Sequence, residues 1–176
     1  PPERRAHPFV ESPMNKAMLH PIWDMMRQRT GILLRCVEAL PADKLDSHPI
    51  AGMRTPKELV VHTAGFMRLV PDAVLNGAVG NVDEKAVVAG IGSKEQLAAF
   101  VKECWTAADQ ATAKVTDAQL GALVSTPWGG SYPGFVMYSI LQDEFLHHRG
   151  QLYAFVRALG AEPPMNWDFE HNAEEF

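Results

Sequence analysis

A chain of 176 residues is long enough for one domain with its own hydrophobic core, and its length argues against a second full domain. Hydrophobic residues make up 47% and charged residues 21%, a balance that excludes an intrinsically disordered chain. The net charge is -5 and no Lys/Arg cluster follows a helix face, which argues against a nucleic-acid or membrane partner and favours a small-molecule ligand.

The chain begins with a polar, proline-rich stretch that has no hydrophobic periodicity. Residues 1–13 therefore predict an extended N-terminal arm. Apolar residues at helical spacing predict the first helix over residues 14–40. The second helix has the clearest start in the sequence, because Thr55 can cap it, Pro56 suits its first turn and Glu58 completes a capping box.

The inward stripe of the second helix combines apolar residues with one histidine. It comprises Leu59, His62, Phe66, Leu69 and Ala73. Pro71 is expected to kink or end this helix, because proline removes a backbone hydrogen-bond donor, and Gly77 closes the segment.

Two further helices follow. A capping box from Ser93 to Gln96 opens the third helix. Glycine and proline are dense in residues 123–134, which predicts a loop or small hairpin there. The fourth helix is predicted over residues 133–159, with Gly160 at its end.

Four long amphipathic segments without an alternating strand pattern predict the fold class. We expect an all-α protein, an antiparallel four-helix bundle, over residues 14–164. Residues 165–176 are expected to form a C-terminal tail that Trp167 and Phe169 anchor to the body. Cys36 and Cys104 lie in predicted helices outside any metal-binding motif, so we interpret them as buried thiols, which fits a reducing, cytoplasmic setting.

One ionisable pair interrupts the apolar stripe of the fourth helix. At about 100° per residue, Glu144 and His148 point within ~40° of the stripe direction. Asp143 and His147 have the same spacing but point ~140° and ~100° away, toward the flank or solvent. The helical wheel therefore selects Glu144 and His148 as the inward pair.

His62 faces inward from the second helix in the same way. Burying a carboxylate costs several kcal/mol unless it is paired or bound to a cation, so an inward Glu144 requires a partner. One partner is a metal ion held by Glu144, His148 and a ligand from a facing helix. The other is a histidine, which gives a hydrogen-bonded pair in the core that binds nothing.

The motif from His147 to Pro164, HHRGQLYAFVRALGAEPP, resembles the last helix of the DinB/YfiT-like family of metal-dependent enzymes. The phrases ALPADKL and TPKELVVHTAGF resemble the end of the family's first helix and its second helix. The resemblance implies a four-helix bundle whose metal is held by a histidine of the second helix and an HxxxH pair of the last helix. Those positions correspond to His62, Glu144 and His148 here.

This sequence departs from the family pattern at one ligand, because Glu144 stands where the family usually has histidine. Two imidazoles and one carboxylate still suit one divalent ion, with zinc or nickel favoured and iron or manganese also compatible. Similar proteins are homodimers, and a homodimer is the expectation here.

The resemblance implies an enzyme, and the reaction stays open between two types. Relatives are thiol-dependent S-transferases and a maleylpyruvate isomerase, which would make a low-molecular-weight thiol a co-substrate. The carboxylate of Glu144 makes the site harder in ligand type, which favours hydrolysis by a metal-activated water instead. The alternative from a different class is a non-catalytic bundle that binds a metal or ligand in a structural or stress-related role. No catalytic residue outside the three ligands is identified.

Overall fold

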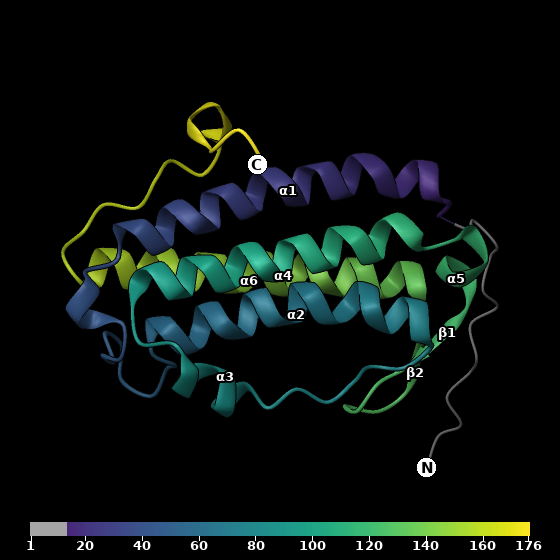
Figure 1. The fold of residues 1–176 in the computed structure, drawn as a ribbon, viewed down its shortest axis with the longest axis horizontal. Coiled ribbons are helices and arrows are strands. Elements are labelled where there is room, and N and C mark those ends of the chain that lie inside the picture. Colours follow the sequence, from purple (N-terminus) through teal and green to yellow (C-terminus); the bar gives the residue numbers. More distant parts are fainter. Residues whose placement is uncertain (1–13) are drawn as a thin grey trace, which may run out of the picture.

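The computed structural model describes residues 14–176, so the predicted arm over residues 1–13 lies outside the described part of the chain. Four long helices form the body: α1 (Lys16–Ala39), α2 (Pro56–Asn76), α4 (Lys94–Lys114) and α6 (Gly134–Ala158). They lie side by side in a bundle (Figure 1). The predicted all-α four-helix bundle is confirmed.

The direction of the helices depends on the crossover between α2 and α4. Figure 1 shows α1 running opposite to α2, and α4 running opposite to α6. The chain between α2 and α4 returns along the whole bundle, so these two helices run in the same direction. The short helix α3 (Glu84–Gly90) lies within this crossover and packs on α2. The sequence analysis did not predict α3.

The remaining short elements before the C-terminal tail lie at the two ends of the bundle (Figure 1). At one end, a 3-10 turn, η1 (Ala42–Lys44), follows α1. At the other end, helix α5 (Asp117–Gly121) leads into a hairpin of two antiparallel strands, β1 (Leu123–Ser125) and β2 (Ser131–Pro133). Residues 123–134 were predicted to form a loop or a small hairpin, and the structure shows the hairpin.

Local signals explain where the long helices begin. The Thr55 side chain accepts from the Glu58 backbone N–H, and the Glu58 carboxylate accepts from the Thr55 N–H, which completes the predicted capping box. Ser93 caps α4 through the Gln96 N–H. The Gln96 side chain, however, accepts from the Gly92 N–H, so the predicted second box is only half formed.

Pro71 does not end α2, which continues to Asn76 and closes at Gly77 in the left-handed conformation. The ring of Pro71 is buried, and Val70 and Val74 beside it are core residues. Tertiary packing of this face outweighs the one hydrogen bond that proline removes.

The core lies along the axis of the bundle, where all four long helices contribute side chains. Its largest fully buried members are Tyr138, Phe145, Phe155, Leu19, Met26, Ile32, Leu33, Leu40, Leu59, Met67, Leu97 and Leu120. Cys36 and Cys104 are free and buried, and burial raises the pKa of both thiols to about 12, so neither is a reactive nucleophile at neutral pH.

The C-terminal tail crosses back over α1 (Figure 1). The short 3-10 helix η2 (Phe169–His171) contacts α1, where Asp168 accepts a 2.8 Å hydrogen bond from Arg35. Phe176 is buried beside Trp105. Trp167, in contrast, is 63% exposed, so it is not the anchor that the sequence analysis expected.

No helix within residues 14–176 combines the length and the apolar character that crossing a membrane requires.

Candidate metal centre

The structure brings His62 of α2 together with Glu144 and His148 of α6. One potential ligand atom from each residue lies within 4.8 Å of the other two. The rings of His62 and His148 meet edge to face with their centroids 4.8 Å apart. Residues more than eighty positions apart in sequence therefore converge because α2 packs against α6 along its length.

A carboxylate from the crossover orients His62. The Nδ1 of His62 donates a hydrogen bond of 2.7 Å to Oε1 of Glu84, in the first turn of α3. This contact leaves Nε2 as the ring nitrogen that is available to an ion. Histidines that bind metals are commonly held in this way, with the second nitrogen donating to a carboxylate.

A glutamine orients His148. The Nδ1 of His148 donates to Oε1 of Gln151 at 3.0 Å, and the Gln151 amide in turn donates to Nε2 of His147 at 2.9 Å. His147 is thus connected to the site through Gln151, although its own side chain is exposed as the helical wheel predicted. Glu84 and Gln151 thus each orient the ring of a candidate ligand through a hydrogen bond. Sequence spacing alone did not identify either role.

The contact between His148 and Glu144 tests whether a cation fits. Nε2 of His148 lies 3.0 Å from Oε2 of Glu144. When Nδ1 donates to Gln151, a neutral imidazole has a lone pair on Nε2, and that lone pair faces a carboxylate oxygen. Two acceptors at this distance need a proton or a metal ion between them. A divalent ion held by His62, Glu144 and His148 satisfies both acceptors, so the residues fit the group.

Glu144 is less buried than the sequence analysis expected. Its side chain is 44% exposed, whereas that of His148 is 8% exposed. The cost of burying a carboxylate therefore gives no argument for a cation at Glu144. The argument that remains is the contact between its oxygen and Nε2 of His148, which a proton or a metal ion can bridge.

Two of the three residues, His62 and Glu144, line a pocket of about 450 Å³ that opens to solvent. Phe66 and Leu69, predicted as core residues, line this pocket as well. Trp128 of the hairpin contributes to the wall, with its ring 6.2 Å from that of Phe66. Among residues 14–176, no lysine or arginine lines the pocket.

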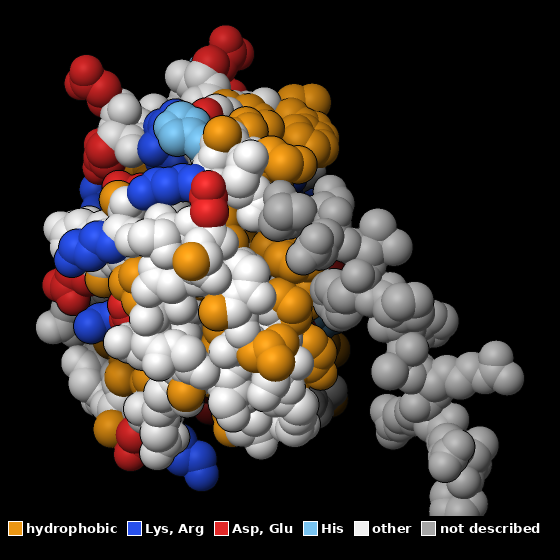
Figure 2. Space-filling view, turned by 90° about the vertical axis from the view of Figure 1, so that its right-hand side faces the viewer, with side chains coloured by type: hydrophobic (Ala, Val, Ile, Leu, Met, Phe, Trp, Pro, Cys, Tyr) orange, Lys and Arg blue, Asp and Glu red, His pale blue; other side chains and the backbone are white. Residues whose placement is uncertain are grey.

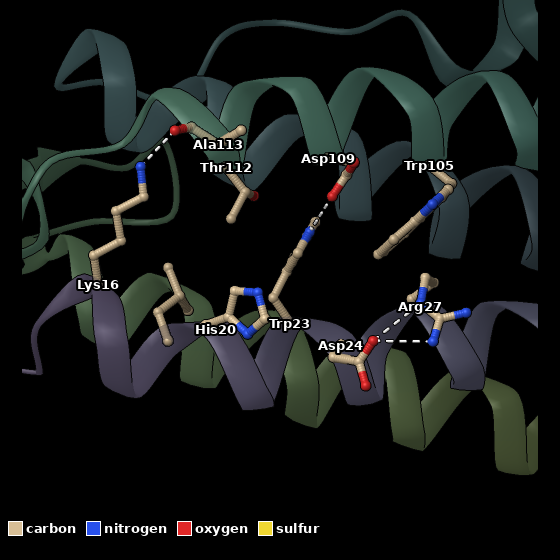
Figure 3. A pocket seen from close by; sticks show the side chains of 10 residues that line it. Lys16, His20, Trp23, Asp24, Arg27, Trp105, Asp109, Thr112 and Ala113 are labelled. Carbon is tan, nitrogen blue, oxygen red and sulfur yellow. Dashed lines mark hydrogen bonds and ion pairs between the residues drawn. The ribbon is translucent and has the colours of Figure 1, made fainter. Parts of the chain in front are cut away.

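A second cavity lies between α1 and α4 and is about 250 Å³ in volume (Figure 3). Trp23 stacks on Trp105 there, and its indole N–H donates to Asp109 at 2.9 Å. Asp24 pairs with Arg27. These polar groups have hydrogen-bond or ion-pair partners within the protein, so they do not indicate a ligand-binding site in this cavity.

Comparison with known proteins identifies the family. The sequence profile of the DinB family matches residues 14–175. The chain belongs to the DinB family.

Solved structures of DinB-like proteins have the same fold. The DinB-like protein YjoA from Bacillus subtilis is 18% identical, with a TM-score of 0.68 over 83% of this chain and 96% of that one. A DinB-like protein from Bacillus cereus is 18% identical, with a TM-score of 0.66 over 82% and 93%. A DinB-family protein from Exiguobacterium sibiricum is 20% identical, with a TM-score of 0.55 over 93% and 99%. No curated protein matches the chain.

Two surface features of this DinB-family protein bear on other kinds of site. On the bundle end that faces the viewer in Figure 2, basic and acidic side chains of the described residues are interspersed and form no basic patch.

A second group of possible metal ligands lies in the tail. Asp168, Glu170 and His171 are also close enough to hold an ion. Asp168 already accepts hydrogen bonds from His171 and Arg35. Its oxygens therefore have partners in the protein and, unlike the His148–Glu144 contact, show no pair of acceptors facing each other.

Removing the carboxylate behind His62 should weaken metal binding. We expect Glu84→Ala to lower the affinity for zinc by roughly 10- to 100-fold, because the ring of His62 loses the acceptor that orients it. Glu84→Gln should lose less, since its amide oxygen can still accept from Nδ1. Competition with a chromophoric chelator measures the Kd. Glu103→Ala, at an exposed glutamate of α4, is the control, and an unchanged Kd in Glu84→Ala contradicts the assigned role.

Proposed function

We propose that this DinB-family protein is a divalent-metal-dependent enzyme that hydrolyses a small, largely apolar molecule without negative charge. The observation that supports it is the convergence of His62, Glu144 and His148 at an open pocket, with Glu84 and Gln151 fixing the two rings. Zinc or nickel suits this mixed set of ligands, and iron or manganese is compatible with it.

Three protein ligands leave coordination positions for water and substrate, and a divalent ion in such a site polarises a bound carbonyl and lowers the pKa of bound water. The protein's own residues do the rest. Glu84 holds the ring of His62 in the pocket lining, and Gln151 holds the ring of His148 beside Glu144. These hydrogen bonds to the second ring nitrogen of each histidine preserve the geometry of the proposed ligands between turnovers.

The pocket lining supports the proposed class of substrate. Its apolar walls suit a hydrocarbon or aromatic group, and its only formally charged side chains are the carboxylates of Glu84 and Glu144. A thiol co-substrate that carries several carboxylates would meet like charge here and no basic partner. The lining therefore favours hydrolysis over the thiol-dependent transfer that the family resemblance implies.

The experiment is a comparison of two substrate panels with the metal-loaded protein. One panel contains neutral esters and amides with apolar groups, and the other contains electrophiles with low-molecular-weight thiols. We expect turnover in the first panel that is lost in His62→Ala and after chelation. Turnover confined to the thiol panel contradicts the proposed reaction, and a metal-loaded protein that is inactive in both panels favours the non-catalytic alternative.

The aromatic wall should contribute to substrate binding. We expect Trp128→Ala to lower kcat/KM for the best neutral substrate by about 10-fold, mainly through KM, because apolar contact of this size is worth ~1–3 kcal/mol. Steady-state kinetics measure the change. Trp167→Ala, which alters an exposed tryptophan of the tail, is the control and should leave both constants unchanged.

A further inference from the structure

A buried arginine without a partner lies on α6, in the residue after His148. Arg149 is only 5% exposed, and its Nη1 has no hydrogen-bond partner. Its electrostatic neighbours are Tyr153, Arg29 and Cys36, so it lies in the seam between α6 and α1. A cation in a buried position needs an anion or several acceptors, because it has lost its water.

A second arginine in the same seam is also poorly satisfied. Nε of Arg29 is buried without a partner, and its Nη1 reaches only Oε1 of Gln142, at the long distance of 3.4 Å. Arg35, two turns along the same helix, shows the contrast. It donates 2.7 Å and 2.8 Å hydrogen bonds to the backbone oxygen and carboxylate of Asp168. The tail therefore neutralises Arg35, whereas no carboxylate within residues 14–176 pairs with Arg29.

A tyrosine hydroxyl in the same seam completes the cluster. The hydroxyl of Tyr153 is buried beside the thiol of Cys36, which is a weak acceptor, and no stronger acceptor among the described residues bonds it. Gln142, Arg149 and Tyr153 follow one another at spacings of seven and four residues, which places them on one face of α6. Two guanidinium groups and one hydroxyl thus lie in one seam, and each has a donor that an acceptor entering the seam could use.

We propose that Arg29 and Arg149, together with Tyr153, form a binding site for a small oxyanion of the phosphate or carboxylate type. The planar fork of arginine matches the oxygens of either anion and bonds them in pairs. Arg29, Gln142 and Tyr153 are only partly buried, so the cluster is not sealed from solvent. The site lies in the α1–α6 seam, whereas the candidate metal centre lies between α2 and α6, so it does not depend on the proposed enzymatic activity.

Thermal unfolding of the full, chelator-treated chain tests the proposal. Chloride is replaced by inorganic phosphate or by acetate at constant ionic strength. We expect the Tm to rise saturably, by roughly 3 °C at ten times the Kd, because the anion binds only the folded state. A rise with phosphate alone assigns the site to phosphate groups, and a rise with acetate assigns it to carboxylates.

Variants place the effect at the cluster. Arg149→Met should raise the Tm in chloride, because it removes an unpaired buried charge, and should abolish the response to the anion. Arg29→Met, at a less buried position, should increase the apparent Kd at least tenfold. Arg68→Met, at an exposed arginine of α2, and His62→Ala, at the metal centre, should both respond as the unmodified protein does.

Three results would overturn the proposal. One is a Tm that neither anion changes. Another is a full response in both Arg149→Met and Arg29→Met, which places the bound ion elsewhere. The third is a Tm that follows protein concentration and not anion concentration, because a second copy of the chain then supplies the missing acceptors.

Discussion

His148→Ala is expected to reduce the divalent metal bound to the purified protein from about one ion per chain to a trace, as measured by elemental analysis of protein prepared without a histidine tag. The variant removes the least exposed of the three proposed ligands and leaves Glu144 without the nitrogen that lies 3.0 Å from it. The loss of affinity should exceed the ~10- to 100-fold expected for Glu84→Ala, because a ligand is lost and not only its support. His62→Ala should have the same effect.

Two other histidines provide matched controls. His20→Ala changes an exposed histidine of α1 and should leave the metal content unchanged. His147→Ala removes the acceptor of the Gln151 amide and should cause at most a small loss of affinity. Unmodified protein that stays metal-free after incubation with zinc contradicts the site, and it supports the interpretation of Glu144 and His148 as a hydrogen-bonded pair that binds nothing.

Gly134→Ala is expected to destabilise the fold by about 2 to 3 kcal/mol, which corresponds to a decrease in Tm of roughly 5 to 10 °C for a chain of this length. Gly134 is the first residue of α6, where the helix packs against α5. A Cβ at this position would lie 2.4 Å from the backbone oxygen of Gln119 and 3.1 Å from the Cα of Leu120. Because both obstacles are backbone atoms, two helices must move apart to admit one methyl group.

Gly150→Ala is the matched control, since it makes the same substitution in the same helix. Nothing lies within 4 Å of a Cβ at Gly150. We therefore expect it to stabilise the protein by about 0.5 to 1 kcal/mol, because alanine loses less backbone freedom than glycine on folding. Denaturant unfolding followed by circular dichroism measures both variants. Equal effects of the two substitutions would show that the packing of α6 on α5 is looser than the structure indicates.

Local signals made the helices of this protein predictable. Thr55, Pro56 and Glu58 mark the start of α2 through hydrogen bonds within four residues, and Gly160 ends α6 in the left-handed conformation. Pro71 shows the limit of such signals. Its effect on α2 depends on how tightly the helix packs against its neighbours, and that contact is not encoded nearby in sequence.

The candidate site was predictable to a similar degree. Helical spacing distinguishes Glu144 and His148 from Asp143 and His147, because direction around a helix follows from residue number alone. Spacing within one helix does not identify a ligand on another, and His62 was assigned through family resemblance together with its place in the inward stripe. The structure brings these three residues together.

The sequence by itself thus determined the all-α bundle, the faces of its helices and the three residues proposed to hold a metal. Only the tertiary structure decided that α3 brings Glu84 to His62 and that Glu144 borders an open pocket. It also decided that Arg29 and Arg149 share a seam in which each has a buried nitrogen without a hydrogen-bond partner among the described residues. The physical reason is the distance along the chain over which each kind of interaction acts. Helix formation and amphipathic direction depend on neighbours within about four residues, whereas the pairing of charges depends on which segments meet after the chain has folded.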